Sequence, residues 1–221
     1  MKKSRKKYIP EIIFIVAFIL IIVGGIYIYL MPVKEAEHRN AYEDTVIEEY
    51  LENEEQEETE IKDNPEIEYQ YSDVNTYNFR GSVDSILVID KINLKKAVIR
   101  GNKLSDNDYN LSKYYFVTED LETTLAGNYI IYGHSSQTYG HSFNRLDELE
   151  ISDEFYLIQG DSQYVYKVEA VDRALRSESE PFFPNLENRV TLVSCEKHLA
   201  KGYSQKRVII VRAVLIEEKS F

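Results

Sequence analysis

The stretch Arg189-Val190-Thr191-Leu192-Val193-Ser194-Cys195 decides the fold. Its apolar, β-branched run at 190–193 is followed by a polar connection and a second apolar run at 208–216, which is typical of strand, loop and strand. The only cysteine of the chain stands where the first run ends. A thiol there is held by a strand on one side and meets a loop on the other, as a nucleophile requires. The alternative is an inert, buried cysteine that packs like a small apolar side chain.

Short strands with turn signals between them dominate the chain from residue 79 onward. We expect strands at 83–89, 94–99, 128–132, 154–159, 164–175, 189–194 and 206–216. Short helices are expected at 104–113 and 143–149. This density of strands predicts a mostly β domain over residues 79–221, folded as a closed β-barrel of about eight strands.

A membrane anchor is predicted near the N-terminus. Five basic side chains within residues 2–7 precede twenty uncharged residues, 12–31. At ~1.5 Å per residue, a helix of this length crosses the ~30 Å hydrocarbon layer. A cleavable signal peptide is the alternative, but its apolar region is usually only about 7–15 residues long. We therefore expect a cytoplasmic tail at 1–11, a single transmembrane helix at 12–31, and the rest of the chain outside the cell.

The acidic charge of the chain lies in residues 32–78. Residues 35–78 carry sixteen acidic and two basic side chains, whereas residues 79–221 carry 21 acidic and 18 basic ones. Helical spacing of Tyr42, Val46, Ile47, Tyr50 and Leu51 indicates a short amphipathic helix. The remainder is too acidic to bury itself, so an extended, mobile extracellular stalk is expected. No basic patch with interleaved aromatic residues occurs, so a nucleic-acid partner is not expected.

Two further stretches carry groups that suit a cysteine nucleophile. Gly127-Asn128-Tyr129-Ile130-Ile131-Tyr132-Gly133-His134 is an apolar strand that ends in Gly-His, and a histidine near a cysteine can move the protons that thiol attack requires. Arg207 opens the final strand, and its guanidinium can hold a peptide backbone or an oxyanion. Taken separately, a turn histidine and a strand-edge arginine are commoner as solvated groups.

Together these residues resemble the sortases, membrane-anchored cysteine transpeptidases of Gram-positive bacteria. TLVSC is similar to the family's TLxTC signature, NYIIYGH to its strand-Gly-His signature, and Arg207 follows the cysteine by about twelve residues on the next strand. The resemblance covers residues 82–215. It implies a sortase-like barrel. We expect no cofactor and no metal ligands among the site residues, and the sequence leaves a requirement for calcium open.

The resemblance also implies a role for each residue. Cys195 would attack the carbonyl of a Thr in the C-terminal sorting signal of a secreted protein, forming a thioacyl-enzyme. His134 would protonate the leaving amine and deprotonate the incoming one, which belongs to a peptidoglycan precursor or another cell-wall amine. Arg207 would hold the substrate or stabilise the oxyanion. Ser194, where the family usually has Thr, and Thr191 would support the substrate or the oxyanion.

The subclass is expected from the connection between the strands at 164–175 and 189–194. Its thirteen residues are too few for the long insertion of class B sortases, so a class A or D type is favoured. Tyr-Gly-His in place of Ala-Gly-His, and the helix before the domain, favour class B. Class C is disfavoured, because 35–78 has no Asp-Pro-aromatic lid and no second apolar span follows residue 211.

The same connection is expected to form part of the substrate groove. Pro181, Phe182 and Phe183 are apolar, and the proline restricts the backbone. A compact apolar groove would suit a Leu-Pro-x-Thr signal, whereas class B enzymes use an Asn-Pro signal. The alternative is that the two phenylalanines merely cap the barrel.

Two other functions fit parts of the sequence. Cys195, His198, His134 and His141 could hold a zinc ion, which would make the domain a metal-stabilised module. The domain could also be an idle, membrane-tethered binding module, in which case the thiol of Cys195 would not depend on His134.

Overall fold

The computed structural model describes residues 9–57, 79–114, 117–119, 127–135, 142–179, 186–198 and 202–220. The chain divides into two compact units, Met1–Ala41 and Tyr42–Phe221. Helix α1 (Ile9–Glu57) begins in the first unit and ends in the second. In the first unit, Ile13–Met31 is long and apolar enough to cross a membrane, with a mean hydropathy of 2.9. It is the one such segment among the described residues.

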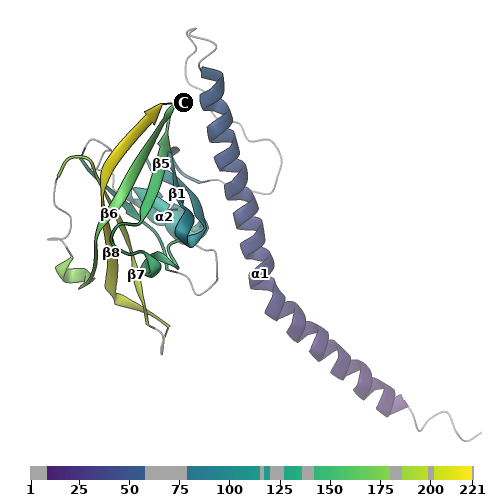
Figure 1. Cartoon of the computed structure of the whole chain (residues 1–221). Coiled ribbons are helices and arrows are strands. Elements are labelled where there is room, and N and C mark those ends of the chain that lie inside the picture. The colour runs from purple at the N-terminus through teal and green to yellow at the C-terminus, as the bar shows by residue number, and fades with distance from the viewer. Residues whose placement is uncertain are drawn as a thin grey trace, which may run out of the picture. The chain divides into compact units, whose positions relative to one another are not determined.

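The second unit is built on a closed β-barrel (Figure 1). The order of the strands around the barrel is β1-β2-β3-β4-β7-β8-β6-β5. Neighbouring strands are antiparallel except for the pairs β2–β3 and β4–β7, which are parallel. The strands are β1 (Ser82–Ile89), β2 (Leu94–Arg100), β3 (Val117–Glu119), β4 (Asn128–Tyr132), β5 (Glu154–Gln159), β6 (Ser162–Leu175), β7 (Arg189–His198) and β8 (Gly202–Ser220).

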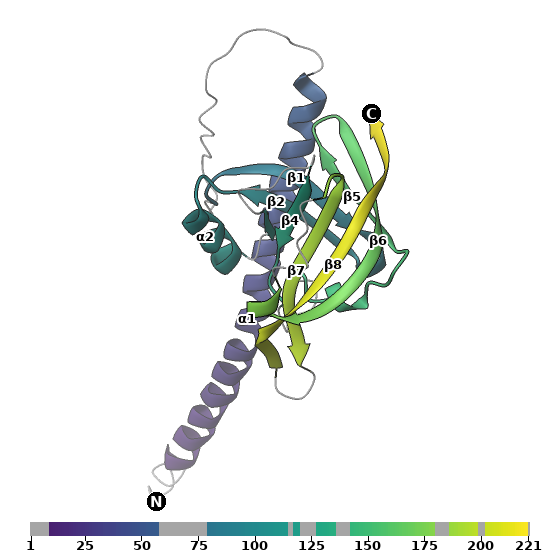
Figure 2. The same cartoon turned by 90° about the vertical axis from the view of Figure 1, so that its left-hand side faces the viewer.

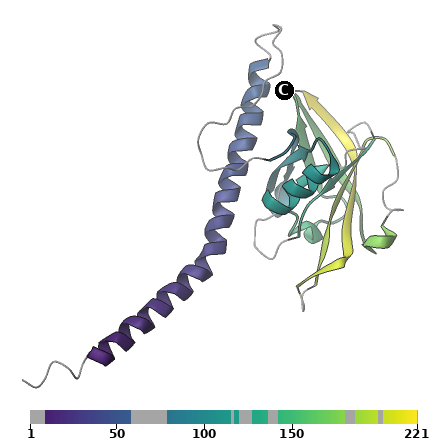
Figure 3. The ribbon, with the colours of Figure 1, turned by 180° about the vertical axis from the view of Figure 1, so that it is seen from behind.

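The predicted fold class is confirmed: the domain is mostly β, with eight strands in a closed barrel and short helices. All seven predicted strands are present, and β4 and β5 have the predicted bounds. Strand β3 was missed, because three residues are too few to show an alternating pattern. The predicted helix at 104–113 is α2 (Leu104–Tyr114), which contacts β2 and β3 on the outside of the barrel (Figure 3).

Three short 3₁₀ helices join the strands. They are η1 (Asp90–Ile92), η2 (Leu146–Glu148) and η3 (Arg176–Glu178). The helix predicted at 143–149 is thus only the single turn η2, preceded by other turns. Its apolar residues do not continue a helical face but point into the barrel, where Phe143, Leu146 and Leu149 are buried.

The interior of the barrel is filled by one apolar cluster to which every strand contributes at least one buried side chain. Phe155 stacks on Tyr166 across β5 and β6, with ring centroids 5.7 Å apart. Leu192 and Val190 of β7 and Val211 of β8 are completely buried in this cluster. Strands β7 and β8 are therefore held firmly by their inward faces, and any residue at their ends rests on a rigid support.

The end of α1 packs on the outside of the barrel, within the second unit. Val46 and Ile47 are buried against Ile86, Ala97 and Ile99 of β1 and β2. The amphipathic helix predicted at 42–51 is therefore present. The expectation of a mobile linker does not hold for these residues, because their apolar face has a partner. The boundaries drawn at 11, 31 and 78 stay predictions.

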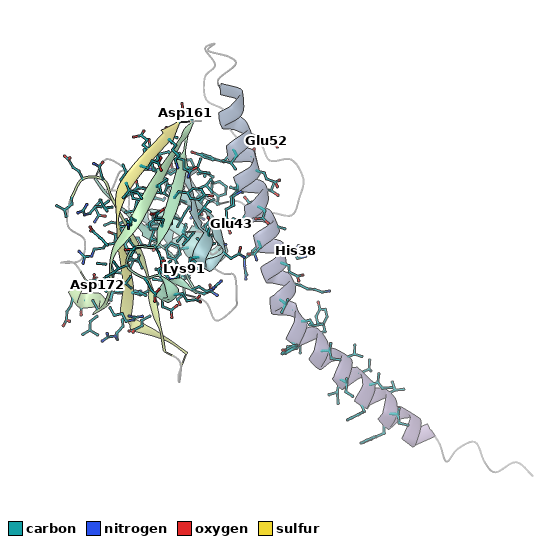
Figure 4. All side chains as sticks on the ribbon, viewed as in Figure 1. His38, Glu43, Glu52, Lys91, Asp161 and Asp172 are labelled. Atoms are coloured by element: carbon teal, nitrogen blue, oxygen red, sulfur yellow. The ribbon has the colours of Figure 1, made fainter. Side chains whose placement is uncertain are left out.

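A buried ion pair fixes this helix on the barrel. Glu43 of α1, labelled in Figure 4, pairs with the ammonium of Lys96 on β2. The two side chains are only 5% and 7% exposed. The other oxygen of the Glu43 carboxylate accepts the backbone N–H of Ala97 at 3.2 Å. Burial raises the pKa of Glu43, whereas the charge of Lys96 acts to lower it. Two turns further on, the Tyr50 hydroxyl accepts the N–H of Gly160 at 3.1 Å.

Candidate active site

Parallel pairing of β4 with β7 brings the Gly-His stretch beside the cysteine. The register runs from Asn128 opposite Arg189 to Tyr132 opposite Val193. Beyond the last pair, Gly133 N–H donates to Val193 O at 3.0 Å, and Ser194 Oγ donates to Gly133 O at 2.9 Å. The next residues of the two strands are His134 and Cys195. The register therefore brings the backbones of His134 and Cys195 to neighbouring positions of two adjacent segments.

Gly133 is required at this junction by close packing. A Cβ atom at this position would lie 2.5 Å from Cδ2 of Phe143 and 2.8 Å from Oγ of Ser142. Both neighbours are buried, so neither can move aside cheaply. The backbone of His134 is held in turn, since its carbonyl accepts the N–H of Phe143 at 2.8 Å.

Cys195 lies at a break in the register of the β7–β8 hairpin, and not at the end of its strand as predicted. Cys195 pairs with Val208, but the next residue, Glu196, pairs with Ser204. Strand β8 thus has extra residues opposite this point, and β7 continues to His198 (Figure 2). Bulges of this kind interrupt the ladder and turn a side chain away from the regular sheet face. Cys195 is half-buried and free of any disulfide.

Arg207 reaches the same region from β8, where it pairs with Leu175 at the end of β6. Its guanidinium Nε donates to Oε2 of Glu196 at 2.6 Å. The other carboxylate oxygen of Glu196 lies 3.3 Å from Nε of Arg173 on β6. Glu196, the residue directly after the cysteine, therefore pairs with two arginines, one from β8 and one from β6.

A second arginine, which the sequence analysis missed, contacts the thiol itself. Arg176 begins η3 directly after β6, and its Nη2 lies 3.4 Å from Sγ of Cys195. Its carbonyl accepts a hydrogen bond from Ser179 Oγ at 2.8 Å, which fixes this turn. No local sequence pattern marks Arg176, because its position level with Arg207 depends on the pairing of β6 with β8. The resemblance to the sortase motifs indicated Arg207 instead.

His134 is held towards its neutral form. Burial of the half-buried imidazole lowers its pKa from the ordinary value of 6.5, and the nearby positive charge of Arg176 lowers it further. A neutral imidazole is a proton acceptor, so His134 is suited to take a proton from a thiol or from an incoming amine.

The hydroxyls of Thr191 and Ser194 have structural partners. Thr191 Oγ1 donates to Oδ1 of Asn128 at 2.8 Å, and Ser194 donates to Gly133 as described above; both hydroxyl-bearing residues are buried. A hydroxyl has one proton to donate, so neither group has one left for an oxyanion in this arrangement. In this structure the two hydroxyls tie β7 to β4. Their expected role beside the substrate or the oxyanion stays a prediction.

The rest of the predicted site lies outside the described residues. This applies to Pro181, Phe182 and Phe183 of the expected groove and to His141 of the zinc alternative. In the described part of the chain, no group of three or more His, Cys, Asp or Glu side chains is placed to hold a metal ion.

Comparison with known proteins identifies the family. The family model of the sortase domain matches residues 87–216, which is more than half of the chain. The chain belongs to the sortase family. Sortases are cysteine transpeptidases that anchor proteins to the cell wall of Gram-positive bacteria, and the apolar helix near the N-terminus suggests that this sortase is anchored in the membrane. No curated protein sequence matches the chain.

Solved sortase structures share the barrel at low sequence identity. Sortase A of Listeria monocytogenes is 18% identical, with a TM-score of 0.53, and the match covers 63% of this chain and 90% of that one. The sortase SrtA of Actinomyces oris is 21% identical, with a TM-score of 0.53, over 66% and 86% of the two chains. Sortase C1 of Streptococcus agalactiae is 19% identical, with a TM-score of 0.50, over 60% and 67%. Both A-type and C-type enzymes resemble this sortase, and the likeness is one of fold alone.

Proposed function

We propose that this sortase cleaves a C-terminal sorting signal after Thr, with Cys195 as the nucleophile and His134 as the acid and base. The observation that carries the proposal is the pairing of β4 with β7, locked by Ser194 Oγ on Gly133 O at 2.9 Å. This pairing supports the placement of a thiol next to a largely neutral imidazole, which acyl transfer by a thiol requires.

The reaction proceeds in two steps. His134 takes the thiol proton as Sγ of Cys195 attacks the Thr carbonyl, and then gives this proton to the leaving amine as the peptide C–N bond breaks. The product is a thioacyl-enzyme. An amine of a peptidoglycan precursor, or another cell-wall amine, then loses a proton to His134 and attacks the thioester, which releases Cys195.

Arg207 is proposed to bind the substrate beside the cysteine. Its guanidinium is paired with Glu196 in the free enzyme, so this role requires substrate carbonyls to compete for the guanidinium or to share it. A planar guanidinium with five donors can keep its bond to Glu196 and still donate to a peptide oxygen.

Peptide cleavage tests the proposed function. The full chain, purified in detergent, is incubated with sorting-signal peptides and an amine acceptor, and the products are separated and weighed. We expect cleavage after Thr and transfer of the N-terminal fragment to the amine. Cys195→Ala and His134→Ala should both lose at least a hundredfold in kcat/KM. Cleavage that survives in Cys195→Ala would overturn the proposal.

We further propose a Leu-Pro-x-Thr signal and a class A or D type. The short connection from η3 to β7 supports this, because it leaves no room for a long insertion beside the groove. Side-by-side cleavage of Leu-Pro and Asn-Pro peptides measures the preference. A clear preference for the Asn-Pro peptide would reject the class A or D assignment and favour class B.

The catalytic domain is proposed to face the cell wall. The basic cluster ahead of the apolar helix supports a cytoplasmic N-terminus, since positively charged segments stay inside. Protease added to intact protoplasts should therefore digest or release the barrel domain. Full protection of the domain in intact protoplasts, with digestion after lysis, would reverse this orientation.

A further inference from the structure

Two arginines, Arg176 and Arg207, come from the strands and turns around the thiol, and their guanidinium groups have different partners. Arg207 is paired with the carboxylate of Glu196, which also pairs with Arg173. The guanidinium of Arg176 donates instead to Sγ of Cys195 at 3.4 Å. In the described part of the chain no carboxylate pairs with Arg176. In the free enzyme, the cation whose field is directed at the reacting sulfur is therefore Arg176.

The position of Arg176 is set by the barrel. Leu175, the last residue of β6, pairs with Arg207 of β8, so Arg176 follows at the level where the β7–β8 register breaks. The hydrogen bond from Ser179 to the Arg176 carbonyl closes the turn that carries the side chain. The guanidinium is thus presented from the β6 side, opposite the β4 side from which His134 comes.

We propose that Arg176 is a second catalytic arginine, whose guanidinium passes from the sulfur of Cys195 to the acyl oxygen when the thiol adds to the substrate. This inference rests on the proposed function. When Sγ bonds to the carbonyl carbon, the carbonyl π pair moves to the oxygen, and that oxyanion lies two bonds from the sulfur. A donor already in contact with Sγ needs only a small shift to reach it. When the C–N bond breaks, the pair returns to form the thioester carbonyl.

The charge of Arg176 also assists the proton transfers. Its field opposes protonation of His134, which keeps the imidazole ready to accept the thiol proton. Once the oxyanion forms, its negative charge offsets the positive charge of Arg176. Protonated His134 is then less disfavoured, at the step in which His134 must hold the proton. Arg207, neutralised by Glu196, cannot act on His134 in this way to the same extent.

Arg176→Gln tests the proposal through acylation. Removing one donor to an oxyanion typically costs 10²–10³-fold in rate. We expect Arg176→Gln to lower the rate of thioacyl-enzyme formation by roughly 10²-fold, and Arg176→Lys to recover only part of it. The control is Arg212→Gln, which removes an arginine of β8 paired with Asp172. An Arg176→Gln enzyme that acylates within threefold of the wild type would overturn the inference and leave the proposed function standing.

A second measurement needs no substrate. The chain has a single cysteine, so alkylation reports on Cys195 alone. The ratio of alkylation rates with iodoacetate and with neutral iodoacetamide measures the positive field at Sγ. We expect Arg176→Gln to lower this ratio by about fivefold, the effect of one charge about 4 Å away in water, and Arg212→Gln to leave it unchanged. An unchanged ratio in Arg176→Gln rejects the inference. A wild-type enzyme that forms no acyl-enzyme with any peptide rejects the proposed function and the catalytic step built on it.

Discussion

At the scale of single residues, the site depends on the interactions among the side chains of His134, Cys195 and Arg176. His134 is half-buried beside the cation Arg176, and both effects disfavour the imidazolium. His134 and Cys195 could be predicted because each follows an apolar run of residues. Such a pattern can be recognised in the sequence without knowing the fold. Arg176 was not predicted, because its importance comes from the pairing of β6 with β8, which no local pattern reveals.

The depressed pKa of His134 predicts a pH dependence of stability. The unfolded chain takes up this proton near pH 6.5, whereas the folded chain takes it up only at a lower pH. The stabilising contribution is therefore complete above pH 6.5 and is lost as the pH falls through the folded pKa. Urea unfolding of the full chain should show the unfolding free energy falling below pH 6.5, and less steeply in His134→Gln. Equal slopes in the two proteins would contradict the depressed pKa.

The same reasoning predicts the acid limb of the activity profile. The kcat/KM for a cleaved peptide should fall with the His134 titration, at a pH below 6.5. Arg176→Gln removes a cation that opposes protonation, so the acid limb of the residual activity should move to higher pH. A limb that stays in place, or moves to lower pH, would show that Arg176 does not act on His134.

Replacing Arg207 by lysine tests the role of the planar guanidinium without changing the charge of the side chain. Its Nε donates to Glu196 at 2.6 Å, and its remaining N–H groups are proposed to hold the substrate. Arg207→Lys keeps the charge but loses the planar fork, so we expect kcat/KM to fall by at least tenfold. Near-normal turnover in the lysine variant would remove Arg207 from the catalytic residues.

At the scale of elements, the site depends on the parallel contact of β4 with β7. Strong β-branched runs made both strands predictable, but the sequence did not disclose that they are parallel neighbours. It also did not disclose the break in the β7–β8 ladder after Cys195, since the hairpin continues on both sides of it. Such a break leaves only a small trace in a sequence, because extra residues on one strand shift the alternation of side chains without ending the strand.

Thr191 tests the contact between these two strands. Thr191→Val keeps the shape of the side chain but leaves Oδ1 of Asn128 without this donor inside the protein. We expect the unfolding free energy to fall by about 1–3 kcal/mol. Thr191→Ser, which keeps the hydroxyl and loses a methyl group, is the matched control and should cost less. If the valine variant is as stable as the wild type, the hydrogen bond does not hold β4 to β7.

At the scale of the whole molecule, the compact unit that contains the barrel begins at Tyr42, ahead of the first strand. Helical spacing at residues 42–51 predicted a helix, but the acidic run after it suggested a solvated stalk. The structure shows why composition misled: the apolar face of the helix covers β1 and β2, and its buried acid has Lys96 as a partner. The partner of a charged side chain can be identified only when the fold is known.

A double-mutant cycle tests this docking. Breaking one partner of a buried ion pair typically costs roughly 3–5 kcal/mol, because the other charge stays buried. Glu43→Gln and Lys96→Met should each destabilise the full chain by up to this amount in urea unfolding. The double variant, which has no buried charge, should be much more stable than the sum of the two losses predicts. Additive losses would show that the two charges do not interact.

Cys195, with His134 as acid and base, is proposed to form a thioacyl-enzyme. Intact-mass measurement of the full chain, mixed with a Leu-Pro-x-Thr-Gly peptide and quenched in acid, tests it most directly. We predict an added mass equal to the peptide fragment that ends in Thr, located on Cys195 by proteolysis, absent in Cys195→Ala and strongly reduced in His134→Ala. An adduct that forms on another residue, or no adduct with any sorting-signal peptide, would contradict the account.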